Sequence, residues 1–261
     1  MYKINLNWDD REAIPDKIRP DVEYLFSRMN EAVIDMVDAR QGDRILDVGC
    51  GRGIEVLKMS EQGAVVIGID PSSFMLDRAR ELSRNNGHNS SLVRAIGESI
   101  PIVPQSVDKI LCKGALDHFA DPEKAIQQMA TVLKPQGQVV IAIANFESLG
   151  FRIGKFIFKV RKLLGIKNPY SRLPWELPND HTMKFDYSSI TNIARRYLVI
   201  DKVTGVSLLF CTPGWGDALS RLPARLSRAV LSTLDGIARA WVGMSDVVIV
   251  RARPLNGLRE N

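Results

Sequence analysis

The segment at residues 47–53 has the sequence DVGCGRG and follows a short β-branched run. A glycine-rich turn after a strand lets backbone N–H groups and the start of a helix approach a ligand closely. The nicotinamide fingerprint GxGxxG would need a third glycine at position 54, where this chain has Ile54. Asp70 ends the next β-branched run, where a carboxylate can accept hydrogen bonds from ribose hydroxyls. Together these features predict a nucleoside ligand other than a nicotinamide dinucleotide.

Four further blocks follow in order. They are GESIPI at 97–102, SVDKILCK at 106–113, HFADPE at 118–123 and VLKPQGQV at 132–139. With DVGCGRG they resemble the succession DxGCGxG, AExLPF, FDxV, HFxDPE and LKPGG of class I S-adenosylmethionine (SAM)-dependent methyltransferases, specifically the methyltransferase-11 and quinone-biosynthesis types. The resemblance covers roughly residues 40–145. It implies an α/β, Rossmann-like fold: seven mostly parallel strands, helices on both faces, an antiparallel last strand and helical lid insertions.

The resemblance implies SAM as the methyl donor and S-adenosylhomocysteine as the product. It places the methionine part over Gly49 and Gly51, with Asp47 directed toward the ammonium group. Asp70 then receives the ribose. The predicted cofactor-binding residues are Asp47, Gly49, Cys50, Gly51, Gly53, Asp70, Pro71, Met75, Gly97, Glu98 and Lys113.

The adenine contacts depart from the family in one position. The resemblance places Pro71 or Met75 beside the ring and the turn at Gly97 and Glu98 along its edge, although Met75 could equally be a core residue. Ile96 stands where the family often has an aspartate that accepts from the adenine amino group. Glu98 or a backbone carbonyl must then make that contact.

Histidine is the residue type suited to removing a hydroxyl proton near neutral pH. Of the three histidines, His88 lies in the polar run NNGHNS, which is typical of a surface turn. His118 follows the fourth predicted strand, where the methyl group should point, and His181 lies in PNDHTMKF, which resembles a substrate-side segment of many relatives. We predict His118 or His181 as the general base. The alternative for His118 is hydrogen bonding in the loop before Asp121.

Hydrophobic periodicity predicts the elements that position these residues. Predicted helices are 21–38, 53–62, 72–84, 121–133, 149–167 and 188–196; predicted strands are 44–48, 65–69, 91–96, 107–112, 138–144, 197–204 and 246–252. Ser72 and Asp121 are expected to cap their helices, and a turn is expected at 134–137. Strands that alternate with helices form right-handed βαβ units and a parallel sheet covered on both faces.

Charge is distributed unevenly along the chain. Residues 1–150 contain 17 basic and 22 acidic residues, whereas residues 151–261 contain 18 basic and 8 acidic residues. A helix over 149–167 would separate a basic face from an apolar face. The basic face holds Arg152, Lys155, Lys159 and Lys162, and the apolar face holds Leu149, Ile153, Phe156, Ile157, Val160, Leu163 and Leu164. The region 218–241 repeats the pattern with Arg221, Arg225 and Arg228 beside Leu222, Leu226, Val230, Leu231 and Leu234.

Such helices can lie on an anionic membrane interface. We therefore predict a lid that handles an apolar or lipid-linked acceptor and contacts an anionic membrane. The alternative is that both segments pack on the core and present basic faces to solvent. Nucleic acid is disfavoured as a partner, because the basic residues alternate with aliphatic residues and few aromatic platforms are available for base stacking.

We divide the chain into an N-terminal helical segment (1–40), a SAM-binding core (41–145), a basic lid (146–187) and the C-terminal part of the sheet (188–261), with a helical insertion at about 208–245. The three cysteines form no CxxC pair and no carboxylate cluster matches a magnesium-dependent methylase, so we predict no metal site. No secretory signal or membrane-spanning apolar run is visible, which predicts a cytoplasmic protein able to associate with membranes.

The leading functional prediction is methyl transfer from SAM to a hydroxyl of an apolar, lipid-like or glycan-linked small molecule. Two alternatives stay open. One is C-methylation of a quinone-like acceptor, and the other is a regulatory protein that binds SAM without catalysis.

Overall fold

The computed structural model describes residues 18–167 and 173–255. These residues build one seven-stranded sheet in the order β3-β2-β1-β4-β5-β7-β6. The strands are β1 (Arg44–Val48), β2 (Val65–Asp70), β3 (Ser91–Arg94), β4 (Val107–Lys113), β5 (Leu133–Ala144), β6 (Leu198–Val206) and β7 (Val247–Pro254). The first five strands pair in parallel, and β7 runs antiparallel between β5 and β6. The predicted fold class is confirmed.

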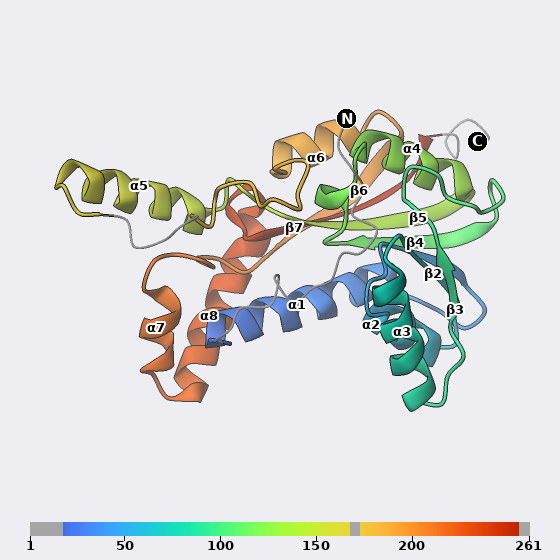
Figure 1. Ribbon diagram of the computed structural model, residues 1–261, viewed down its shortest axis with the longest axis horizontal. Helices are drawn as coiled ribbons and strands as arrows, with labels where there is room; N and C mark the ends of the chain where they lie inside the picture. Colours follow the sequence, from blue (N-terminus) through green and yellow to red (C-terminus); the bar gives the residue numbers. More distant parts are fainter. Residues whose placement is uncertain (1–17, 168–172, 256–261) are drawn as a thin grey trace.

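Helices cover both faces of the sheet (Figure 1). One apolar core lies against α1 (Pro20–Val37), α2 (Ile54–Glu61) and α3 (Ser73–Asn85). The other lies against the short helix η1 (Leu116–His118), α4 (Pro122–Val132) and α6 (Tyr187–Ala194). Between β6 and β7 the chain forms α7 (Trp215–Ser220), α8 (Ala224–Ala240) and η2 (Val242–Met244), and α8 packs against β6 and α1. Burial on both faces explains the near-continuous apolar sequence of β5.

Two helix starts agree with their sequence signals. The Ser72 side chain accepts a hydrogen bond from the Met75 N–H at the start of α3, and Asp121 accepts from the Lys124 N–H at the start of α4. These caps satisfy N–H groups that have no partner within the helix. Both helices therefore begin directly beyond the carboxyl edge of the sheet, next to the predicted site.

The sequence predicted a separate turn at 134–137, and this prediction is wrong. β5 already begins at Leu133, which pairs with Val107, and the next paired residues are Lys109 and Gln138. The register therefore shifts, so that a longer stretch of β5 faces a shorter stretch of β4, as in a bulge. Pro135 and Gly137 produce this irregularity inside the strand instead of ending a loop before it.

The helix predicted over 149–167 is shorter, because α5 (Leu149–Leu163) ends before Gly165, which has a positive φ of 70°. Figure 1 shows α5 projecting from the body of the molecule. It packs through Gly150 against the backbone of Phe210, and through Gly154 against Trp175. The predicted apolar face is largely uncovered: Phe156 is 67% exposed and Leu163 is 79% exposed.

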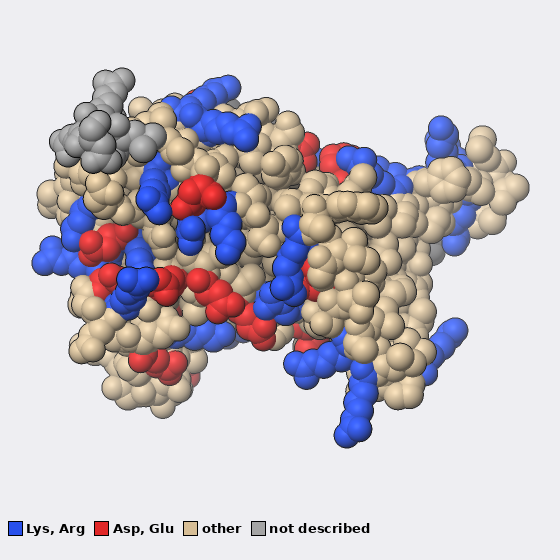
Figure 2. Space-filling model, turned by 180° about the vertical axis from the view of Figure 1, so that it is seen from behind, with Lys and Arg blue, Asp and Glu red and all other residues tan. Residues whose placement is uncertain are grey.

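Figure 2 shows Lys and Arg side chains, and no acidic ones, on the projecting end of α5. Residues 149–167 contain neither Asp nor Glu. Among residues 18–167 and 173–255, no helix combines the length and apolar character needed to cross a membrane. The first 17 residues of the predicted N-terminal segment lie outside the described residues.

Candidate active site at the carboxyl edge of the sheet

The glycine loop turns sharply over the end of β2. The N–H groups of Gly49 and Cys50 both donate to the Ile69 carbonyl, at 2.8 and 3.0 Å. Gly49 has a φ of 75°, and a Cβ at this position would lie 2.4 Å from the Cβ of Ala115, so both conformation and space require glycine here. A Cβ at Gly51 would meet no atom within 4 Å. The loop therefore presents its backbone to open space at Gly51.

Asp70, at the end of β2, anchors this loop. Its carboxylate accepts hydrogen bonds from the Gly51 N–H at 3.0 Å and the Ser72 N–H at 2.8 Å, one on each oxygen. Burial raises the pKa of Asp70, and these two bonds oppose the rise. Each carboxylate oxygen has two lone-pair sites, so Asp70 retains capacity to accept from a ligand's hydroxyls.

Asp47 is the most unusual polar group of the loop. Its side chain is buried, and Oδ2 has no hydrogen-bond partner. Burial raises its pKa well above the ordinary value, nearby Glu55 raises it further, and Lys113 opposes the rise. Lys113 Nζ binds Glu55 at 2.5 Å and Asn30 at 2.8 Å. Asp47 thus lies within electrostatic range of two further carboxyl groups, Glu55 and Asp70, and of one ammonium group, an arrangement that suits a positively charged ligand.

Three other predicted cofactor residues have packing roles. The Cys50 thiol points into the core against Gly68, so only its backbone faces the loop. Gly53 begins α2 in a left-handed conformation, and a Cβ there would lie 2.9 Å from the Cβ of Ala79. Met75 is fully buried, whereas Pro71 keeps exposed surface.

The turn after β3 is held by contacts with the loop before α4. A Cβ at Gly97 would lie 2.6 Å from the Phe119 ring, so this glycine lets the ring pack against the turn. Glu98 is buried, and its Oε1 accepts from the Asp121 N–H at 3.2 Å. Glu98 therefore fixes the predicted adenine edge to the start of α4.

The structure brings both predicted catalytic histidines together. The rings of His118 and His181 meet edge-on with centroids 4.4 Å apart. Asp117 lies against both: its Oδ2 is 3.2 Å from His181 Nδ1, and its Oδ1 is 4.0 Å from His118 Nε2. His118 also lowers the pKa of Asp70 electrostatically. His118 is therefore within electrostatic range of the predicted ribose carboxylate, and His88 stands apart in its turn after α3.

Hydrogen bonds fix the segment that carries His181 to η1. The Thr182 N–H donates to the Asp117 carbonyl at 2.8 Å, and its hydroxyl donates to the Phe119 carbonyl at 2.5 Å. His118 Nδ1 is 3.1 Å from the Asp180 carbonyl. The two histidines, 63 positions apart in the chain, are thus held by backbone contacts between two ordered segments.

An aromatic row extends from the histidines to α5. The Phe146 ring lies 6.1 Å from the His181 ring and 5.7 Å from Phe151. Phe151 in turn lies 6.5 Å from Trp175, which lies 5.3 Å from Phe158. The histidine pair is therefore continuous with a row of aromatic rings that ends on the projecting helix.

Comparison with known proteins identifies a domain within the chain. Residues 46–141 match the family model described as a methyltransferase domain. The ubiquinone biosynthesis O-methyltransferase of Saccharophagus degradans is 35% identical over 103 residues, which are 39% of this chain and 44% of that protein. The enzyme of the same name from Klebsiella pneumoniae is 29% identical over 168 residues, 58% of this chain and 68% of that protein. The chain carries a class I SAM-dependent methyltransferase domain.

Comparison with solved structures supports the same fold. A geranyl diphosphate methyltransferase solved in complex with SAM aligns with a TM-score of 0.59 at 17% identity, covering 90% of this chain and 87% of that chain. In sequence, the chain spans from under half to about two thirds of the length of the two curated relatives. The methyltransferase domain uses SAM as its methyl donor, as the resemblance implied.

The site of the methyltransferase domain fits this donor. SAM carries an ammonium and a sulfonium group, and a positive charge near Asp47 would offset the burial and the carboxyl neighbours that raise the pKa of Asp47. The buried Asp47 Oδ2 without a partner is the kind of acceptor that an ammonium group would satisfy. Gly51 leaves room for close approach of the ligand to the backbone.

Sequence reasoning missed several residues of the methyltransferase site. Asp117 precedes His118 directly, so its carboxyl group could have been noticed from the chain alone. Glu55 lies in the first turn of α2, where an acidic residue also suits the helix dipole, which hid its role beside Lys113. Asn30 and Phe146 gave no sequence signal, because only the folding of α1 and of the segment after β5 brings them to the site.

Proposed function

We propose that this methyltransferase transfers the SAM methyl group to a hydroxyl of an apolar, lipid-like or glycan-linked small molecule. The observation that carries the proposal is the continuity between the histidine pair and the aromatic row that runs to α5. A polar activating group at the inner end and aromatic rings along the way suit an apolar molecule with one reactive hydroxyl.

Bound SAM supplies the methyl group as a sulfonium: the acceptor oxygen forms a bond to the methyl carbon, the carbon–sulfur bond breaks, and its electron pair stays on sulfur in S-adenosylhomocysteine. The protein's contribution is alignment. Asp47 would hold the ammonium group of the donor and Asp70 its ribose, and Gly49 and Gly51 would leave room for its methionine part. The hydroxyl proton leaves at the histidine pair, where His118 and His181 activate the acceptor.

The remaining predicted cofactor residues keep their proposed places. Pro71, and not Met75, is proposed to lie beside the adenine, because Pro71 is partly exposed while Met75 is buried. Gly97 and Glu98 shape the adenine edge through Phe119 and Asp121. Lys113 balances Asp47 and Glu55, and Cys50 and Gly53 shape the loop.

Two relatives that match this chain are named ubiquinone biosynthesis O-methyltransferases, which supports oxygen over carbon as the acceptor atom. C-methylation of a quinone-like acceptor has no separate observation in its favour.

The test is transfer of label from isotopically labelled SAM into lipid and small-molecule extracts, with the full chain. Labelled product is expected in the organic-solvent fraction, and cleavage of aryl or alkyl methyl ethers should release the label. Label retained after ether cleavage would show C-methylation. SAM binding without transfer into any extract would support the regulatory alternative instead.

We further propose that α5 contacts an anionic membrane. Its exposed Phe156 and Leu163 would enter the interface, while basic residues such as Lys159 and Lys162 meet anionic headgroups. Vesicles containing phosphatidylglycerol should sediment the protein, and Leu163→Asp should release it. Lys124→Asp on α4, away from α5, is the matched control. Equal sedimentation of both variants, or none by the unaltered chain at low salt, would refute membrane contact.

A further inference from the structure

The donor atoms of Asp117, His118 and His181 converge on one small volume. One ligand atom from each residue can be chosen so that all three lie within 4.8 Å of one another. Ligands at about 2.0–2.2 Å from a shared tetrahedral ion lie roughly 3.3–3.6 Å apart. The 3.2 Å between Asp117 Oδ2 and His181 Nδ1 is close to this spacing, and His118 Nε2 lies 4.0 Å from Asp117 Oδ1.

A second, independent observation points into the same volume. The Asp117 side chain is only 7% exposed, and its Oδ1 has no hydrogen-bond partner. That oxygen faces His118 Nε2 at 4.0 Å. Buried carboxylate oxygens are normally paired, because removal from water without a partner is unfavourable. A cation between Oδ1 and the imidazole would supply the missing partner.

The backbone around the cluster resembles the support that metal ligands need. A ligating histidine usually donates its other ring N–H to a carbonyl or carboxylate, which fixes the ring. His118 Nδ1 lies 3.1 Å from the Asp180 carbonyl, which leaves Nε2 directed toward Asp117. The Thr182 N–H bond to the Asp117 carbonyl holds the two ligand-bearing segments together. Little reorganisation is therefore required for binding.

The donor set selects the class of ion. Magnesium and calcium prefer oxygen ligands, whereas two imidazoles and one carboxylate suit zinc and other divalent transition metals. His118 and His181 are 23% and 15% exposed, so solvent or an acceptor oxygen can approach the same volume. Such a partly open, three-ligand arrangement is typical of catalytic metal sites.

The geometry points to a binding site for one divalent transition-metal ion, such as Zn²⁺, formed by Asp117, His118 and His181. The proposal that the ion binds does not depend on the proposed function, whereas its use in catalysis rests on that function. There the ion would lower the pKa of an acceptor hydroxyl and ease loss of its proton to solvent. The two histidines would then act as ligands and not as a free general base.

The test uses the full chain, stripped with a chelator and titrated with Co²⁺ as a spectroscopic probe, followed by competition with Zn²⁺. We expect visible absorption that saturates at one ion per chain and is abolished by Zn²⁺. His181→Gln and His118→Gln should each weaken Co²⁺ binding at least tenfold, and Asp117→Asn should do the same. His88→Gln removes a histidine outside the cluster and should bind as tightly as the unaltered chain.

Circular dichroism checks that each variant is folded, and the two partly exposed histidine positions keep the test valid if Asp117→Asn unfolds. Absent saturable absorption, or binding unchanged in both histidine variants, would overturn the site. Methyl transfer is measured separately on the stripped and Zn²⁺-loaded chain. Binding without any transfer leaves the ion site standing and refutes the proposed function. Full transfer by the stripped chain, lost in His181→Gln, overturns the ion's catalytic use and supports a general base.

Discussion

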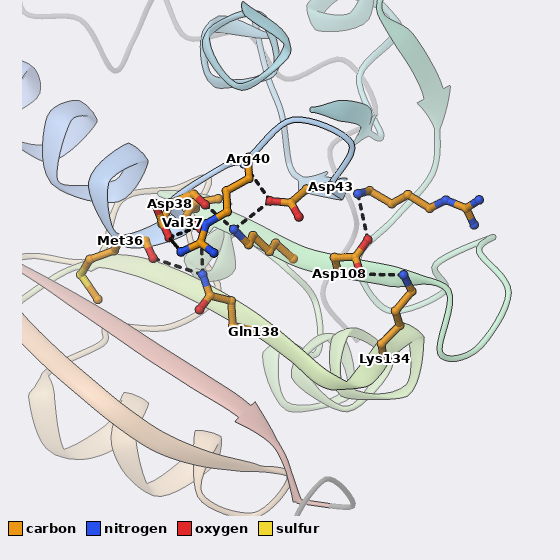
Figure 3. Close-up of polar contacts among 10 residues, drawn as sticks. Met36, Val37, Asp38, Arg40, Asp43, Asp108, Lys134 and Gln138 are labelled. Atoms are coloured by element: carbon orange, nitrogen blue, oxygen red, sulfur yellow. Dashed lines mark hydrogen bonds and ion pairs between the residues drawn. The ribbon is translucent and has the colours of Figure 1, made fainter. Parts of the chain in front are cut away.

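The two edges of the sheet differ in whether their polar and charged groups are paired. At the amino edge, polar groups are paired (Figure 3): Lys109 binds Asp43 at 2.8 Å and the Asp38 carbonyl, and Lys134 binds Asp108 at 2.6 Å. Gln138 donates to the Val37 carbonyl at the end of α1. At the carboxyl edge, buried oxygens of Asp47, Asp117 and Asp246 have no hydrogen-bond partner.

The pKa directions follow this difference. Burial tends to raise the pKa of Asp108 at the amino edge, but its bonds with Lys134 and the Arg44 N–H outweigh burial and lower it. At the carboxyl edge, burial dominates and raises the pKa of Asp47 and Asp246. Charged groups thus add to the stability of the folded state at the amino edge and reduce it at the carboxyl edge, where the proposed donor site lies.

The largest expected effect is a pH dependence of stability that Asp246 controls. Burial raises the pKa of Asp246 from 3.8 to about 7. Between these values the folded state keeps a proton that the unfolded state has lost, so stability falls as pH rises, by up to a few kcal/mol. Asp246→Asn should flatten this fall between pH 4 and 7 in urea denaturation. An unchanged slope would contradict the assignment.

At the amino edge of the sheet, the dependence of stability on pH has the opposite sign. The lowered pKa of Asp108 contributes stability above pH 4 that disappears as pH falls below this value. Asp108→Asn should therefore reduce stability at neutral pH and leave stability at pH 3 nearly unchanged, which gives an internal control for the Asp246 measurement.

Asp47→Asn should weaken SAM binding but raise the stability of the ligand-free protein. Loss of the charge that faces the ligand's ammonium group should weaken SAM binding roughly 10- to 100-fold, measured by calorimetry. The ligand-free protein should unfold at a higher temperature, because an unpaired buried carboxyl group is gone. Asp108→Asn is the matched control and should keep SAM affinity. A variant that binds SAM normally would remove Asp47 from the site.

Lys109→Met should lower the free energy of unfolding by about 1–2 kcal/mol, because Asp43 would lose its cationic partner in a largely buried pair and keep the Arg40 N–H as a donor. Urea denaturation measures the change, and SAM affinity should stay the same. Lys124→Met, at an exposed position on α4, should leave stability unaltered. A loss of SAM affinity in Lys109→Met would show that the two edges are coupled.

The smallest effect is expected at Arg40. Its ion pair with Asp38 is 2.7 Å long, but both side chains are well exposed. Exposed pairs contribute little because water screens them and ordering both side chains is costly. Arg40→Ala should leave the urea midpoint unchanged. A measurable shift would show that exposure alone does not decide what the amino-edge pairs contribute.

The sequence was most informative where local chemistry decides structure. Ser72 and Asp121 cap their helices through bonds to N–H groups three residues away, so the short-range pattern sufficed. The loop at Gly49 and Gly51 likewise follows from conformations that only glycine adopts easily. Here the predicted elements and the cofactor loop lie where expected.

Prediction was weaker where distant segments meet. The approach of His181 to Asp117 depends on Thr182 bonding across to η1, which no local pattern reveals. The turn expected at 134–137 was wrong because pairing with β4 draws that segment into a strand. The apolar face of α5 was identified, but its exposure depends on which side Trp175 and Phe210 occupy.

The position of β7 constrains how the molecule is made. It is the last strand along the chain, yet it lies between β5 and β6. A translation product that stops before Val247 would contain every residue of the proposed donor site but two unpaired strand edges, which are templates for aggregation. A chain truncated before Val247 is therefore expected to be an aggregation-prone, protease-sensitive fragment and not a smaller enzyme.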